Sequence, residues 1–141
     1  MGLNRSLFLT QRLRLLRHVA VKVSNITSGY FSYQNKSMVT YFPDGRTPFV
    51  KHETGTKNPW LMPAQLKDIG VDHEMYLFMK AIVLCDPAVD GLSDHARRLL
   101  GAEREKYATA LMRYILASYG AQQAPMMFVD CLKFLEVLDS Q

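Results

Sequence analysis

Acidic residues are absent from the first 43 positions of this 141-residue chain, and the first carboxylate is that of Asp44. Six of the 17 Lys and Arg residues precede it, so the first 43 residues carry a charge of +6. The remaining residues carry −2, and the whole chain carries +4. An acid-free, basic beginning is typical of an organelle-targeting segment or of a surface that binds an anionic partner.

Cysteines are few and long apolar runs are missing. Cys85 and Cys131 each lie within an apolar stretch, which excludes a disulfide framework and favours a reducing compartment. The longest mostly apolar run, residues 75–85, is interrupted by Lys80 and is too short to span a bilayer. We therefore expect no transmembrane segment, although contact with a membrane surface stays open.

Sequence signatures of catalysis and of metal binding are also missing. Neither cysteine has a second ligand at the spacing of a metal site, and there is no glycine-rich phosphate-binding loop. His52, His73 and His95 each neighbour an acidic residue, but adjacent residues on a helix do not face each other. We therefore expect a protein that is not an enzyme and that holds no cofactor or metal.

The basic beginning itself predicts an amphipathic helix. Leu9, Leu13, Leu16 and Ala20 recur at helical spacing, and arginines supply the polar surface. This pattern is typical of a mitochondrial presequence, because the membrane potential draws a cationic helix inward. We expect the leader to remain attached as a structural arm, with residues 1–36 forming this arm and a connector that is irregular or extended over residues 24–37.

A second interpretation of the same segment is acylation. Residues 1–6 fit the N-myristoylation pattern, with Gly2 as the acceptor. One acyl chain gives only marginal membrane binding, and the nearby arginines would supply a second signal. A small peripheral membrane protein is therefore an alternative.

Residues 37–141 predict a small β-hairpin followed by about four packed helices. Residues 38–42 are rich in strand formers, residues 43–46 have turn chemistry, and residues 47–52 form the returning strand. The expected fold class is therefore α+β and predominantly helical, with a basic N-terminal helical arm. The helices are expected to begin near Pro63, Asp72, Ser93 and Pro125, and to end near Gly70, Leu84, Gly120 and Leu138. Leu111 and Leu132 are expected in the core.

The candidate binding surface combines basic and aromatic side chains near the beginning of the chain. Cations contact phosphates, and aromatic rings stack on unpaired bases. The predicted contacts with nucleic acid or another anionic partner are Arg5, Arg12, Arg14, Arg17, Lys22, Tyr30, Tyr33, Lys36 and Arg46.

These observations predict a non-catalytic, supernumerary structural subunit of a mitochondrial assembly. The mitochondrial ribosome is favoured, with the basic arm on rRNA and the helical body on neighbouring protein subunits. The expected location is the matrix or the matrix face of the inner membrane. The alternative is a soluble accessory subunit of a respiratory-chain or ATP-synthase complex.

Overall fold

The computed structural model describes residues 2–37 and 61–139. These residues form five helices and, within the described ranges, no strand. The predominantly helical character predicted from the sequence is therefore confirmed, whereas the predicted hairpin at residues 38–52 lies outside the described residues. The helices are α1 (Gly2–Gln34), α2 (Met62–Ile69), α3 (His73–Leu84), α4 (Asp94–Tyr119) and α5 (Ala124–Asp139).

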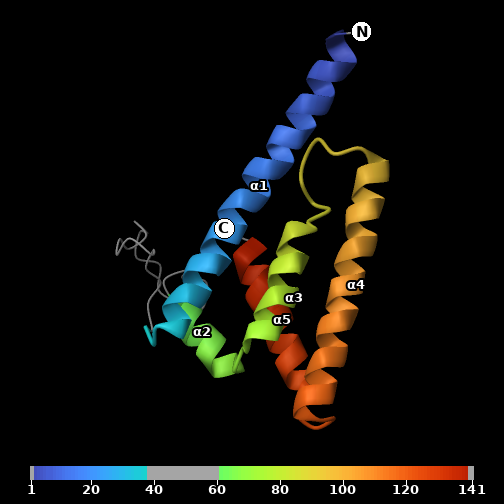
Figure 1. Cartoon of the computed structure of the whole chain (residues 1–141). Helices are drawn as coiled ribbons and strands as arrows, with labels where there is room; N and C mark the ends of the chain where they lie inside the picture. The colour runs from blue at the N-terminus through green and yellow to red at the C-terminus, as the bar shows by residue number, and fades with distance from the viewer. Residues whose placement is uncertain (1, 38–60, 140–141) are drawn as a thin grey trace.

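The first helix is longer than the sequence suggested. α1 has 33 residues, and its N-terminal half extends beyond the other helices (Figure 1). The irregular connector expected at residues 24–37 is wrong, because α1 continues through Gln34. Burial of Ile26 and Tyr30 outweighs the weak helix propensity of the Ser, Asn and Thr residues around them. The buried Ser32 hydroxyl is satisfied within the helix, where it donates to the Ser28 carbonyl at 2.8 Å.

Local signals set the ends of the later helices as expected. Asp72 accepts a hydrogen bond from the Met75 N–H and begins α3, and Ser93 does the same for the Ala96 N–H and α4. Gly70 ends α2 in the left-handed conformation, with a φ of 79°. α4 continues without a break through Gly101, which is therefore tolerated inside the helix.

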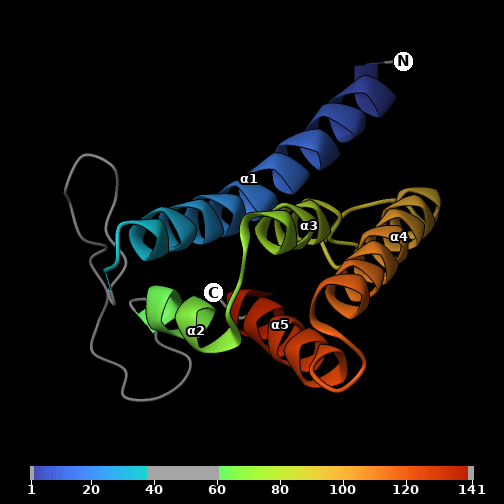
Figure 2. The ribbon, with the colours of Figure 1, turned by 60° about the horizontal axis from the view of Figure 1, so that its bottom comes forward.

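One core joins all five helices. α3 packs against α1, α4 and α5, and α2 packs against α1 and α5 (Figure 2). Leu111 is fully buried, as predicted, but Leu132 is only half-buried, and the neighbouring Cys131 occupies the core instead. The division of the chain at residues 36 and 37 stays a prediction, although Ile26 packs into the same core as the later helices.

Candidate functional site

A buried ion pair joins α1 to the segment that follows α3. Lys22 Nζ donates a hydrogen bond to Asp86 Oδ2 at 2.8 Å, and the two residues are only 5% and 3% exposed. His18, one turn earlier on α1, places its Nε2 atom 2.7 Å from the same oxygen. The other Asp86 oxygen accepts from the Ala88 N–H at 2.9 Å. Buried charges are costly unless they are paired and hydrogen-bonded, and here both conditions are met.

The same network reaches α4 and α5. Lys22 Nζ also donates to Asp139 Oδ1 at 3.0 Å, and Arg104 Nη2 donates to Asp139 Oδ2 at 3.3 Å. Arg104 Nη1 lies 3.9 Å from Asp86 Oδ1. Two cations and two carboxylates, with His18 beside them, therefore connect four separate segments of the chain.

The pKa values in this network indicate a structural role and not acid–base catalysis. Burial alone would raise the pKa of Asp86, but hydrogen bonds from Lys22, the Ala88 N–H and His18 lower it to about 2. Burial alone would lower the pKa of Lys22, and its bonds to Asp86 and Asp139 raise it instead. Both groups stay ionised near neutral pH, whereas a general acid or base needs a pKa close to the working pH.

A second polar cluster holds the end of α4 against the start of α3. Asp72 Oδ2 accepts hydrogen bonds from the Tyr114 hydroxyl at 2.7 Å and from the Tyr119 hydroxyl at 2.5 Å. Burial opposes ionisation of Asp72, but these bonds and the capping N–H of Met75 lower its pKa. The hydrogen bond to Asp72, helped by burial, raises the pKa of Tyr119 to about 12. Asp72 is therefore both a helix cap and a tie between helices.

Two of the residues predicted to contact an anionic partner are enclosed by the protein itself. Lys22 belongs to the buried network described above. Tyr30 is 6% exposed, and its ring stacks on that of Tyr76 with the centroids 3.9 Å apart. Tyr33 is half-buried and packs edge-on against Tyr30. Tyr30 thus lies in the core and Tyr33 packs against it.

The predicted cations that stay on the surface are Arg12, Arg14 and Arg17 of α1, and Lys36 just after it. The side chains of Arg5 and Arg46 lie outside the described part of the chain. Contact of the exposed cations with an anionic group therefore stays a prediction.

The exposed half of α1 also carries an apolar face. Leu9, Leu13 and Leu16 are 53%, 56% and 61% exposed, and their spacing places them on one side of the helix. Among the described residues, each of these leucines thus keeps more than half of its surface exposed. Apolar patches of this kind mark interaction or ligand-binding surfaces.

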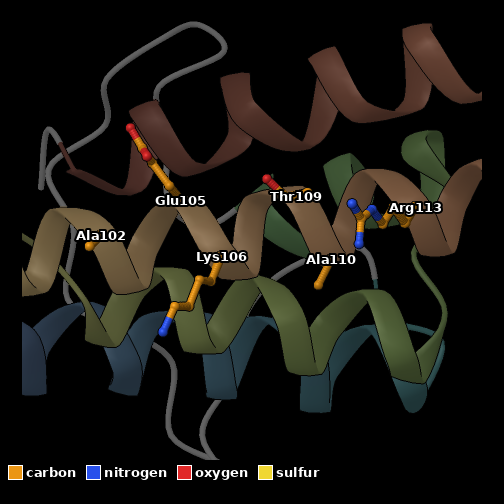
Figure 3. Close-up of a pocket in the computed structure, with 6 residues that line it drawn as sticks. All are labelled: Ala102, Glu105, Lys106, Thr109, Ala110 and Arg113. Atoms are coloured by element: carbon orange, nitrogen blue, oxygen red, sulfur yellow. The ribbon is translucent and has the colours of Figure 1, made fainter.

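Two open hollows lie elsewhere on the helices. One of about 580 Å³ is lined by residues of α4 alone, with Lys106 and Arg113 among them (Figure 3). Another, of about 620 Å³, lies between α2 and α5, with Ile69, Phe134 and Val137 among its lining residues. Over residues 2–37 and 61–139 there is no cluster of His, Cys, Asp and Glu able to hold a metal ion. Within the same ranges no helix has the length and hydropathy of a bilayer span.

Comparison with known proteins identifies the domain. Residues 5–141 match the family described as the ligand-binding domain of nuclear hormone receptor. The chain belongs to this family. Nuclear hormone receptor family member nhr-136 of Caenorhabditis elegans is 36% identical over 136 residues, which cover 90% of this chain and 31% of the relative. Its relative nhr-60, from the same organism, is 35% identical over 130 residues, which cover 92% of this chain and 29% of nhr-60. The chain thus spans about a third of the length of the curated relatives it matches.

Membership in the nuclear hormone receptor family overturns the mitochondrial predictions. The chain is not a mitochondrial ribosomal subunit, and the expected rRNA partner, the ribosomal neighbours and the mitochondrial location are wrong. The alternative predictions, a respiratory-chain or ATP-synthase subunit and an acylated membrane protein, are wrong for the same reason. A basic helix with apolar residues at helical spacing is compatible with mitochondrial import. The pattern fits equally well a helix such as α1, whose second half packs into the core of a receptor domain. Charge and periodicity alone do not distinguish an import signal from a helix that packs into a receptor domain.

The sequence pattern does not reveal the network that organises this receptor domain. Asp86, His18 and Asp139 are not among the residues that the sequence pattern singles out. One signal was present: Lys22 lies between Val19, Val23 and Ile26 at helical spacing. A lysine in such an apolar face predicts a buried carboxylate partner, but it does not say which one.

Proposed function

We propose that the protein acts as part of a ligand-regulated transcription factor, with its helices contributing to the ligand-binding domain. The observation that carries the proposal is the family match over residues 5–141. Nuclear hormone receptors are ligand-regulated transcription factors and not enzymes, so the proposed role is regulatory and non-catalytic. The proposed partners are a small ligand, a second receptor and coregulator proteins, and the proposed location is the nucleus or the cytoplasm.

The apolar face of α1 supports this function. Small-molecule sites are mostly apolar, and amphipathic helices of partner proteins bind by burying apolar residues in a groove. Leu13 and Leu16 offer such surface on a helix whose other end is fixed by Ile26 and Tyr30 in the core. The rigid half of α1 thus supports the half that is available for contact.

A reporter assay tests the proposal. The full chain is fused to a heterologous DNA-binding domain and expressed in cells that carry the matching reporter gene. We expect reporter activity to change when lipophilic fractions of a cell extract are added. A receptor domain whose fusion is folded and nuclear but answers to no fraction would contradict the proposed ligand regulation.

A matched pair of variants ties the response to α1. Leu16→Asp places a charge on the exposed apolar face and should abolish the response. Leu99→Asp makes the same change on α4, at a residue that is 55% exposed, and should leave the response intact. Circular dichroism of both variants shows whether the fold is retained. Equal responses from the two variants would remove the α1 face from the proposal.

A further inference from the structure

A hollow of about 580 Å³ is lined by residues of α1 and of the segment that joins α3 to α4. That segment runs beside α1 (Figure 1). The three α1 residues that line the hollow stand at positions i, i+3 and i+4, which places them on one helix face. The lining residues are Arg14, Arg17, His18, Ala88, Val89 and Asp90.

The two arginines of this hollow are available for a ligand. Neither Arg14 nor Arg17 has an ion-pair partner within residues 2–37 and 61–139. Asp90 lines the same hollow but lies beyond ion-pair distance of both. Two cations therefore face one carboxylate, which leaves an excess positive charge even when His18 is neutral.

Gly91 allows the Arg14 side chain to lie against the backbone of the segment. A Cβ atom at position 91 would stand only 2.7 Å from Arg14 Nη1. Gly91 also has a φ of 86°, which side-chain-bearing residues rarely adopt. The glycine therefore leaves room for the Arg14 guanidinium beside the hollow. A side chain at position 91 would occupy this space.

His18, the third residue of α1 that lines the hollow, is held in place by the buried network of Lys22 and Asp86. Its Nε2 atom contacts Asp86 at 2.7 Å and Lys22 at 2.9 Å. Its Nδ1 atom has no hydrogen-bond partner in the part of the chain that the structure describes. The buried network thus fixes an imidazole ring at the wall of a cationic hollow.

We propose that this hollow binds a phosphate monoester group, with Arg14 and Arg17 as the two donors. Guanidinium groups match phosphate oxygens in paired hydrogen bonds. A phosphate monoester has three terminal oxygens and a charge of about −1.5 to −2 at neutral pH, whereas a carboxylate has two oxygens and one charge. Two guanidiniums on one helix face therefore suit the phosphate group better.

Isothermal titration of the full chain with inorganic phosphate tests the site, at an ionic strength held constant with sodium acetate. We expect saturable binding of phosphate, weakened about tenfold or more in Arg14→Gln/Arg17→Gln. Asp90→Asn should bind more tightly than the wild type, because it removes the carboxylate from the hollow. Arg98→Gln, at an exposed arginine of α4, is the matched control and should bind like the wild type. Equal binding by the wild type and the double variant would overturn the proposal.

Two further titrations distinguish the source of the phosphate. Binding of glucose 6-phosphate with the same dependence on Arg14 and Arg17 identifies a soluble monoester. Binding to phosphatidylcholine vesicles that contain a phosphoinositide, but not to vesicles of matched charge that contain phosphatidylserine, identifies a lipid headgroup. Equal binding to both vesicle types would show attraction to charge alone and would contradict a phosphate site. Any of these results leaves the reporter response to lipophilic ligands as a separate question.

Discussion

Lys22 of α1 and Asp86, 64 residues later in the chain, form a buried ion pair at 2.8 Å. Because Asp139 and Arg104 join the same network, this pair lies where α1, α4 and α5 meet the segment after α3. It fixes the position of the helix whose other half is exposed. Its removal is therefore the most direct test of how the domain is held together.

Replacing Lys22 with Met keeps the length of the side chain but leaves Asp86 buried without its closest cation. Breaking a buried pair in this way costs roughly 3–5 kcal/mol of the free energy of unfolding. We expect a loss near the lower end, because His18 and the Ala88 N–H still contact Asp86. Urea unfolding followed by circular dichroism measures it.

An exposed ion pair provides the control for this variant. Lys106 pairs with Glu103 at 2.9 Å on the surface of α4. Lys106→Met should leave the urea midpoint unchanged within error. The double variant Lys22→Met/Asp86→Asn should recover part of the stability lost in Lys22→Met. A Lys22→Met protein as stable as the wild type would refute a structural role for the network.

The low pKa of Asp86 predicts how stability depends on acid. The folded value is about 2, against 3.8 for an unperturbed aspartate. Because the folded pKa is the lower one, the ionised group stabilises the protein above pH 4, and this contribution is lost as the pH falls towards 2. The two values correspond to about 2 kcal/mol. Urea unfolding across this pH range should show the difference between the wild type and Asp86→Asn shrinking with acid, and a constant difference would contradict the assignment.

Helix boundaries were predictable because their signals are local. Asp72 and Ser93 each bond to an N–H three residues later, and Gly70 needs only its own conformation to end α2. The extension of α1 was not predictable in this way, because burial of Ile26 and Tyr30 against distant helices decides it. Local propensity favours a break there, and tertiary packing overrides it.

The candidate site was harder to predict than the helices. The sequence predicts Arg14 and Arg17 as contacts of an anionic partner, and both side chains are exposed. Their neighbours in the hollow, Ala88 and Asp90, come from a segment more than 70 residues away, and nothing local indicates that it returns to α1. Long-range pairing of this kind follows from the fold and not from residue spacing.

The core position of Leu111 predicts a large effect of truncation. Its side chain is 0% exposed, so Leu111→Ala leaves a cavity between helices and should cost about 2–5 kcal/mol in the free energy of unfolding. Leu99→Ala, on the same helix but 55% exposed, should cost much less. Thermal unfolding of both variants makes the comparison. Similar losses in the two would show that α4 does not pack by the face described.

The Tyr119 hydroxyl predicts an effect at alkaline pH. Its pKa is raised to about 12, so its neutral form stabilises the folded state below pH 10, and this contribution is lost as the pH rises towards 12. Tyr119→Phe removes the hydrogen bond to Asp72 and should cost about 1 kcal/mol at neutral pH, because the pair is only half-buried. Ultraviolet titration of the variant should lose the tyrosine that ionises last. Tyr107→Phe is the control, and an identical titration of both variants would contradict the assignment.

Replacing Gly29 with Ala should have two effects of opposite sign on the free energy of unfolding. Ala favours a helix interior over Gly by about 1 kcal/mol. A Cβ at position 29, however, would lie 3.1 Å from the Met62 Cβ, which the backbone of α2 holds in place and which is almost fully buried. Overpacking costs about 1–3 kcal/mol, so we expect Gly29→Ala to lower the free energy of unfolding by about 1 kcal/mol.

Gly101 supplies the matched control for Gly29, because it also lies inside a helix but a Cβ there would meet no atom within 4 Å. Gly101→Ala should therefore gain the helix propensity alone and raise the free energy of unfolding by about 1 kcal/mol. Urea unfolding of the two variants should give changes of opposite sign. Gly29→Ala made in a Met62→Gly background should not show the overpacking penalty, because the Met62 Cβ that the new methyl group meets is gone. If Gly29→Ala stabilised the protein as much as Gly101→Ala, the close contact between α1 and α2 would not exist in solution.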